Sequence, residues 1–142
     1  MTKNLIVTII LLSLFGTSYA KVQSVYVTGQ LKCNGSPVPN VKVQLYDYDF
    51  ITADDKMGED ITNDGGLFSV SGSEDEFFSI DPYIVIEHSC NARREGLKTC
   101  YRKFRLWIPR SYINKGKYPT RHYGLGTFDL ENKYPREKED CR

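Results

Sequence analysis

Apolar residues alternate with polar residues in one segment after another of this chain, and a period of two is typical of β-strands with one buried face. A helical fold would need a period near 3.6 instead. The apolar members of the alternating segments are Val25, Val27 and Leu31; Val41, Val43 and Leu45; Phe68 and Val70; Ile84 and Ile86; Phe104, Leu106 and Ile108; and Phe128 and Leu130. About seven short strands separated by turns predict an all-β fold, a β-sandwich of two sheets.

The segments between these strands predict how the strands are joined. Residues 63–66 (NDGG) supply the positive φ angles of a tight hairpin. Residues 47–60 are expected to form a long acidic loop, residues 73–78 a short helical turn or a loop, and residues 109–113 one helical turn. The strand over residues 82–88 is apolar on both faces and is predicted to be central. We expect the space between the sheets to be lined by Val43, Leu45, Ile84, Ile86, Phe104 and Leu106.

The N-terminus has the three parts of a secretory signal peptide, predicted over residues 1–20. A charged start precedes the apolar residues 5–15, and small residues lead up to a cleavage site after Ala20. The apolar run is short for a membrane span, which disfavours an uncleaved anchor. Cleavage leaves residues 21–142 as one secreted domain with a charged tail over residues 131–142. No later apolar run reaches spanning length, so no membrane-spanning segment is expected in the mature chain.

All four cysteines lie in the mature part of the chain, and an even number in a secreted protein predicts two disulfides. Three pairings satisfy that count. We expect Cys90 to pair with Cys100, because one ends a strand and the other begins the next. Cys33 would then pair with Cys141 and hold the charged tail. No cysteine pair has metal-site spacing, so neither a metal nor another cofactor is predicted.

Charge is divided unevenly along the chain. Residues 47–87 contain twelve acids and one base, whereas residues 93–121 contain ten bases and one acid. One interpretation is that the two blocks lie on neighbouring strands and neutralise each other. The other is that the basic block steers an anionic partner to the protein.

The basic block supplies the candidate binding residues. Arg93, Arg94 and Lys98 lie between two cysteines, and Lys103 and Arg105 alternate outward beside Trp107, the only tryptophan. Arginine forms paired hydrogen bonds with phosphate or sulfate, so an anionic lipid, a sulfated glycan or an unknown extracellular protein is the expected partner. No nucleic-acid partner is predicted.

The sequence does not predict a catalytic site. His88 and His122 are the only imidazoles, and the cysteines are better explained as disulfides than as nucleophiles. His88 is expected to be a hydrogen-bonded core or edge residue, and His122 to lie in an exposed loop. The acidic residues lack the spacing of a twelve-residue calcium loop. We therefore expect a protein that is not an enzyme.

Several runs of residues, in order along nearly the whole mature chain, resemble the nematode transthyretin-like proteins. They are residues 27–35 (VTGQLKCNG) with Pro37 and Pro39, 41–47 (VKVQLYD), 62–68 (TNDGGLF), 84–90 (IVIEHSC), Ile108-Pro109 with Tyr112-Ile113, and 139–141 (EDC). The resemblance implies a transthyretin-like (prealbumin-like) sandwich and a place outside the cell or at its surface. Activity in this family is mostly undefined, so the resemblance implies little about function.

Two functions known among more distant relatives are not supported by the residues. The channel residues of the hormone carrier transthyretin have no assigned counterparts in this sequence, and the four cysteines indicate a different surface. The hydroxyisourate hydrolases end in a Tyr-Arg-Gly-Ser signature, whereas this chain ends in Asp140-Cys141-Arg142. The favoured interpretation is a secreted, non-enzymatic binding or adaptor protein. The alternatives are a carrier of a small apolar ligand in an oligomer and, less favoured, an uncharacterised hydrolase.

Overall fold

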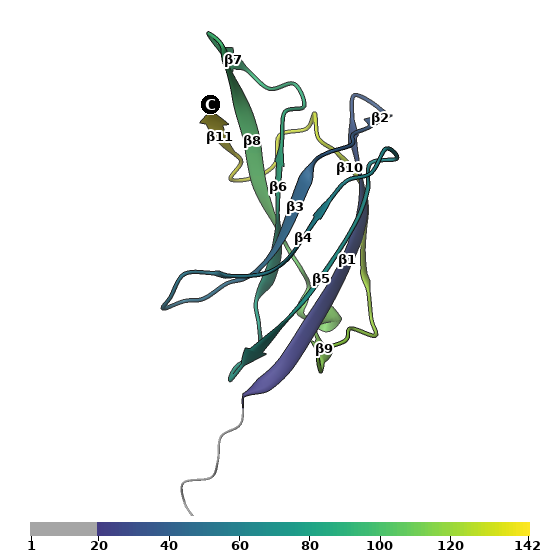
Figure 1. The fold of residues 1–142 in the computed structure, drawn as a ribbon, viewed down its shortest axis with the longest axis vertical. Coiled ribbons are helices and arrows are strands. Elements are labelled where there is room, and N and C mark those ends of the chain that lie inside the picture. Colours follow the sequence, from purple (N-terminus) through teal and green to yellow (C-terminus); the bar gives the residue numbers. More distant parts are fainter. Residues whose placement is uncertain (1–19) are drawn as a thin grey trace, which may run out of the picture.

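The computed structural model describes residues 20–142, which form a sandwich of two β-sheets (Figure 1). These residues contain eleven strands, of which seven have six residues or more, in agreement with the alternation in the sequence. The expected signal peptide, residues 1–20, lies outside the described residues apart from Ala20. Within residues 20–142, no helix is long and apolar enough to cross a membrane.

The first sheet is built around β1 (Lys21–Cys33), the longest strand. The strand β5 (Leu67–Glu76) pairs antiparallel with most of β1, and β10 (Tyr123–Asp129) runs parallel to it. Two short strands, β2 (Ser36–Pro37) and β9 (Asn114–Lys115), pair with the two ends of β1. The sheet is therefore mixed, and its central strand begins the described chain.

The second sheet is antiparallel, and its central strand is β6 (Pro82–His88), as its two apolar faces predict. The other strands, from one edge to the other, are β11 (Lys138–Cys141), β8 (Lys98–Trp107), β3 (Lys42–Asp47) and β4 (Asp55–Ile61), with β6 between β8 and β3. The two-residue strand β7 (Arg94–Glu95) forms a hairpin with the start of β8. The short helical turn expected after β8 is present as η1 (Arg110–Tyr112).

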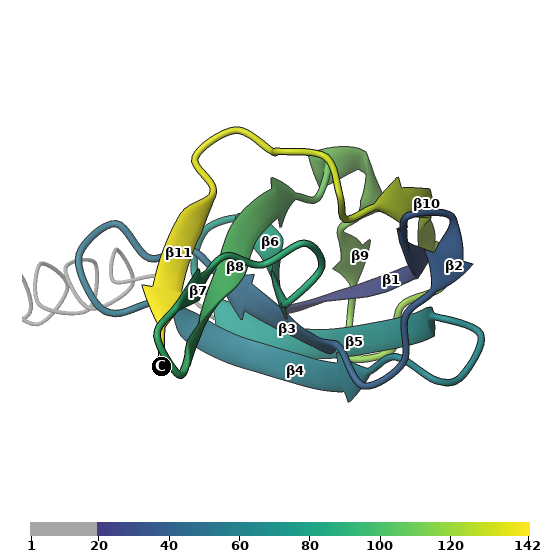
Figure 2. The same cartoon turned by 90° about the horizontal axis from the view of Figure 1, so that it is seen from above.

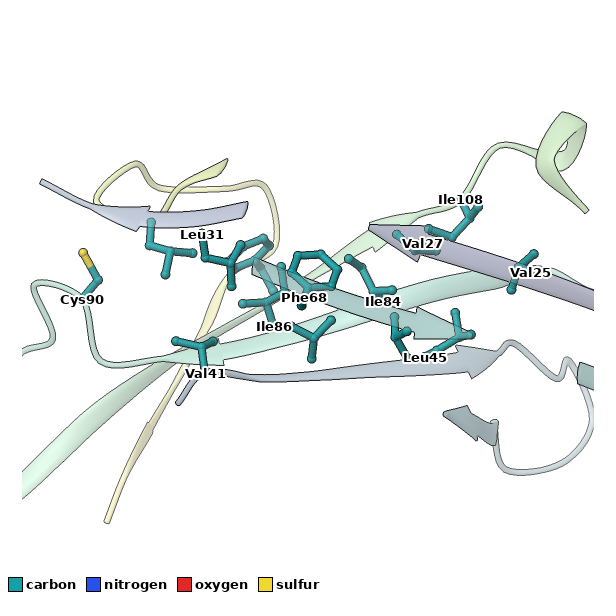
Figure 3. Packing of buried hydrophobic residues seen from close by; sticks show 14 of the residues in the cluster. Val25, Val27, Leu31, Val41, Leu45, Phe68, Ile84, Ile86, Cys90 and Ile108 are labelled. Carbon is teal, nitrogen blue, oxygen red and sulfur yellow. The ribbon is translucent and has the colours of Figure 1, made fainter. Parts of the chain in front are cut away.

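The hydrophobic core fills the space between the two sheets (Figure 3). Five of the six predicted lining residues are fully buried, and the sixth, Leu106, is half-buried against them. Phe104 occupies the centre of an aromatic cluster, with its ring 4.5 Å from that of Tyr134 and 6.3 Å from that of Phe128. Because a large side chain buries the most apolar surface, this cluster is a major source of stability.

Both disulfides form, but the predicted pairing is wrong. Cys33 is bonded to Cys90 and Cys100 to Cys141. The chain leaves the sheet after β6 and turns at Asn91, whose φ of +49° lies in the left-handed region. The Cys100 N–H bonds to the carbonyl of Arg93 instead of pairing with Cys90, so Cys90 is free to reach the end of β1.

Two loops expected from the sequence are partly strands. Residues 73–76 continue β5, and residues 55–60 belong to β4, which forms a hairpin with β3. The chain passes from the second sheet to the first between these two strands, and glycines permit the close approach. A side chain at Gly58 would overlap the Ser71 carbonyl oxygen, and one at Gly72 would overlap Met57.

Candidate functional site

A cationic groove of about 600 Å³ lies beside β8. Its lining comes from the end of β8, from the start of β11 and from the segment just before β11. The lining residues are Lys103, Phe104, Arg105, Trp107, Pro135, Arg136 and Lys138. The segment that joins β10 to β11 arches from the first sheet to the outer edge of the second (yellow in Figure 2), and it supplies the groove's second wall.

The strand register brings two like charges together at one end of the groove. Lys103 of β8 and Lys138 of β11 are direct partners across the antiparallel ladder. Like charges in that position repel each other and destabilise the pairing. Among residues 20–142, no carboxylate lies at ion-pairing distance from Lys103, Arg136 or Lys138. Glu87 of β6, the other ladder partner of Lys103, is paired with Arg142. The groove therefore holds positive charge that an anion would neutralise.

Arg136 adds a second unfavourable feature to the same place. Its φ is +58°, a conformation that a residue with a side chain rarely adopts. Such backbone strain costs roughly 1–3 kcal/mol and persists only where the surroundings hold it in place. In this protein the next residue, Glu137, makes the contact that keeps Arg136 in this backbone conformation.

A buried ion pair fixes the wall of the groove. The Arg102 Nε and Nη2 donate to the two Glu137 oxygens at 2.6 and 3.0 Å. The other guanidinium N–H groups donate to the carbonyls of Cys90, Leu130 and Asn132. Burial by itself raises the pKa of Glu137, but hydrogen bonds from Arg102 and from the Tyr134 N–H outweigh it and hold the pKa below its ordinary value. The pair thus stays charged and ties the segment to β8.

Trp107 forms the far end of the groove and is held by aromatic neighbours. Its ring lies 5.1 Å from that of Tyr83 and 5.9 Å from that of Tyr48. Arg105 stacks 4.7 Å above the Tyr83 ring and lies 3.9 Å from Asp54, which also accepts the Tyr83 hydroxyl. Arg105 is therefore partly neutralised, whereas Trp107 remains 51% exposed in a fixed orientation.

The structure separates the predicted basic residues into two groups. Lys103 and Arg105 line the groove, while Arg93, Arg94 and Lys98 belong to the hairpin at the opposite end of β8. Arg93 is paired with Glu95 and Glu139 at 3.4 and 3.1 Å, and Arg94 donates to the Leu97 carbonyl. Five residues of extended chain, about 17 Å, separate Lys98 from Lys103, the nearest groove residue of β8, so one small ligand does not contact both groups.

Two groove residues, Arg136 and Lys138, were missed because they lie in the segment described only as a charged tail. The signal that would have placed them is Cys141. Its bond to Cys100 aligns β11 with β8, and counting back three residues sets Lys138 opposite Lys103.

The acidic and basic blocks neutralise each other only in part. Within residues 20–142, two ion pairs join them, Arg105 with Asp54 and Arg110 with Asp81. Other bases are paired with acids of the C-terminal segment, as with Arg102 and Glu137. The interpretation that the blocks simply cancel is therefore incomplete.

A cluster of carboxylates remains in the acidic block. Asp47, Asp49 and Glu76 bring oxygens within 4.8 Å of one another. Burial is the main cause of a raised pKa at each of them, and repulsion from neighbouring carboxylates adds to it; the pKa of Asp47 rises to about 6. This cluster lies on β3, on the loop after it and on β5. The same loop borders the groove, because the Asp49 N–H donates to Asp54, which lies 3.9 Å from Arg105.

Neither histidine is arranged as a catalytic base. His88 is buried, its Nδ1 accepts the Cys90 N–H at 3.1 Å, and burial followed by repulsion from Arg102 lowers its pKa to about 4. His122 is exposed and packs its ring 4.2 Å from that of Tyr26. These placements agree with the expected core role for His88 and the exposed loop for His122.

Comparison with known proteins identifies relatives along nearly the whole chain. The sequence pattern of a family described as "TTR-52: Transthyretin-like family" matches residues 28–109. Transthyretin-like protein 5 of Caenorhabditis elegans is 48% identical over 137 residues, covering 94% of this chain and 96% of that protein. Transthyretin-like proteins 2 and 1 of the same organism are each 37% identical and each cover 85% of this chain, with 84% and 81% of their own lengths matched.

Proposed function

Because this chain belongs to the transthyretin-like family, we propose that it is a secreted, non-enzymatic binding protein whose cationic groove holds an anionic group of an extracellular partner. The observation that carries the proposal is the pairing of Lys103 with Lys138 across the ladder, with Arg136 beside them and, among residues 20–142, no carboxylate at ion-pairing distance from any of the three. Glu87, the partner of Lys103 on β6, is paired with Arg142 instead. An anion in the groove would relieve this repulsion.

Secretion is supported by the cysteines and by the N-terminus. All four cysteines form disulfides, which persist in oxidising compartments outside the cytosol. The sequence pattern of residues 1–20 is that of a signal peptide. Expression of the full chain in a eukaryotic cell should release into the medium a protein that begins at Lys21 and has no free thiol.

A binding role is favoured over catalysis and over transport of an apolar ligand. The disulfides leave no cysteine thiolate as a nucleophile, and the pKa of His88 is too low for a base that works near neutral pH. An apolar ligand would have to desolvate the groove's cations without compensating them. An anionic ligand supplies that compensation.

The test uses Trp107 as a reporter, since it is the only tryptophan in the chain and it lines the groove. Inorganic tripolyphosphate, added to the purified mature domain, should change the tryptophan fluorescence in a saturable way. Raising NaCl from roughly 0.05 to 0.5 M should weaken this binding strongly, because salt screens exposed charges. A fluorescence signal that does not respond to tripolyphosphate at low salt would contradict the proposal.

Two triple variants that remove equal charge locate the site. The groove variant combines Lys103→Ser, Arg136→Ser and Lys138→Ser and should lose tripolyphosphate binding. The hairpin variant combines Arg93→Ser, Arg94→Ser and Lys98→Ser and should keep it, because Arg93 is already paired with acids. Loss of binding in the hairpin variant alone would assign the anion site to the hairpin instead.

A further inference from the structure

The groove joins a row of cations to an exposed aromatic ring. Lys103, Arg105 and Trp107 occupy alternate positions of β8 and are all exposed, so they share the outer face of the sheet. Successive members are separated by about 7 Å, and the row spans about 13 Å. Arg136 and Lys138 stand across the groove from this row. Charge and aromatic surface thus lie along one line.

The tryptophan at the end of this line is oriented before any ligand arrives. Tyr83 and Tyr48 contact its ring from within the sheet and from the loop after β3. Tyr83 is itself fixed, since it is 2% exposed and stacks at 5.6 Å on Tyr46. Half of Trp107 nevertheless faces solvent. An aromatic residue with this combination of rigidity and exposure is suited to stack against a flat ligand at little entropic cost.

We infer that the anionic partner is a sulfated polysaccharide, an inference that rests on the proposed binding function and specifies its ligand. A sugar ring presents C–H bonds with partial positive charge, which are attracted to the negative face of an aromatic ring. Its sulfate groups accept hydrogen bonds from ammonium and guanidinium groups. A linear sulfated chain satisfies both requirements along the groove, with a ring on Trp107 and sulfates at Lys103, Arg136 and Lys138.

The shape of the site favours a polysaccharide over a membrane surface. The cations lie inside a groove that has β8 on one side and residues 135–138 on the other. A planar bilayer meets side chains that protrude from a surface, and it would contact the rims of such a groove before its base. A single extended chain enters the groove and contacts both walls.

Isothermal titration calorimetry with two probes separates stacking from charge. The probes are a heparin hexasaccharide and inorganic tripolyphosphate, titrated into wild type, Trp107→Ala, Trp107→Phe and Tyr118→Ala. Trp107→Ala should weaken hexasaccharide binding by about three- to tenfold, the range typical of an aromatic stacking contact. The same variant should bind tripolyphosphate within about twofold of wild type, since no cation is lost. Trp107→Phe should restore part of the hexasaccharide affinity.

Tyr118→Ala is the matched control, because Tyr118 is an aromatic residue that is 78% exposed and outside the groove. It should leave both affinities unchanged. Melting curves of each variant confirm that the fold is retained, and Trp107→Phe keeps an aromatic ring against Tyr83 if Trp107→Ala is unstable.

Several results would overturn the inference while leaving the proposed function standing. One is binding of tripolyphosphate by wild type without binding of the hexasaccharide. A second is an equal loss of affinity for both probes in Trp107→Ala. A third is binding to phosphatidylglycerol vesicles by a protein that does not bind the hexasaccharide. The absence of binding to either probe by wild type would instead contradict the proposed function itself.

Discussion

The Arg102 guanidinium lies 2.6 Å from the Glu137 carboxylate in a buried ion pair, and this contact ties the second wall of the groove to β8. Removing one partner of such a pair leaves the other charge buried without compensation. The groove and the stability of the domain therefore depend on the same interaction.

Replacing Glu137→Gln should lower the free energy of unfolding by about 3 kcal/mol, the usual cost of breaking a buried pair. Urea unfolding followed by fluorescence measures this change. The control is Glu139→Gln, which removes the exposed partner of Arg93 and should cost less than about 1 kcal/mol. Similar losses in the two variants would show that the Arg102–Glu137 pair has no special role.

The aromatic cluster in the core gives a second prediction. Phe104 is 1% exposed and lies between the sheets, so Phe104→Ala should cost about 3–5 kcal/mol through lost burial and the cavity that remains. Leu97→Ala, at a position that is 97% exposed, should leave stability nearly unchanged. Thermal unfolding of both variants decides the point, and an unchanged melting temperature for Phe104→Ala would contradict the observed strand faces.

The disulfide pairing can be read from a tryptic digest of the unreduced protein. Trypsin places each cysteine in a different peptide: residues 33–42, 57–93, 99–102 and 139–142. The structure predicts that the first two peptides are linked and that the last two are linked. Mass spectrometry before and after reduction identifies the links. A link between 57–93 and 99–102 would support the pairing expected from the sequence and contradict the structure.

Local patterns in the sequence were sufficient to predict the fold. Val43 and Leu45 are two residues apart, as are Ile84 and Ile86, so the local sequence alone predicts that each pair shares one face of a strand. Each of these side chains is buried as expected. The prediction that β6 is central rested on the same local information and is confirmed. The family resemblance is confirmed as well.

The disulfide pairing and the groove depend on contacts between residues that are far apart in the sequence. Continuing the β6–β8 register beyond the pair His88 and Arg102 would set Cys90 opposite Cys100, and the incorrect pairing follows from that extension. The register in fact ends at His88, and the chain turns at Asn91. No local pattern gives the direction in which Cys90 then points. The groove depends on the same missing information, because its second wall is placed by the bond from Cys100 to Cys141.

The buried carboxylate Asp47 predicts one form of pH dependence. Burial, with repulsion from Glu76 and Asp49, raises its pKa from 3.8 to about 6, against a hydrogen bond from the Asp81 N–H that lowers it. A raised pKa in the folded state means that the protonated form is favoured by folding. This contribution to stability is present below pH 3.8 and is lost as the pH rises through 6.

Asp47→Asn should therefore be more stable than wild type at pH 7.5 by about 1–3 kcal/mol, with the difference vanishing below about pH 4. Asparagine keeps an oxygen to accept the Asp81 N–H, which lies 2.7 Å away in the wild type. Asp64→Asn, in an exposed turn, serves as the control and should show no such gain. A variant that is less stable than wild type at every pH would contradict the repulsion within the cluster.

His88 predicts the opposite dependence over nearly the same range. Burial, followed by repulsion from Arg102, lowers its pKa from 6.5 to about 4, so the folded protein keeps a neutral ring where the unfolded chain binds a proton. Stability from this group is present above pH 6.5 and is lost as the pH falls toward 4. The maximum loss is about 3 kcal/mol.

His88→Asn isolates this effect, because asparagine can accept the Cys90 N–H that bonds to Nδ1 in the wild type but does not titrate. Urea unfolding of wild type and variant should be compared at several pH values from about 7.5 down to 4.5. The contribution of Asp47 is common to both proteins and cancels in the difference. Wild type should lose about 2–3 kcal/mol relative to the variant across this range. Parallel stability curves would mean that folding does not lower the pKa of His88, contrary to its burial beside Arg102.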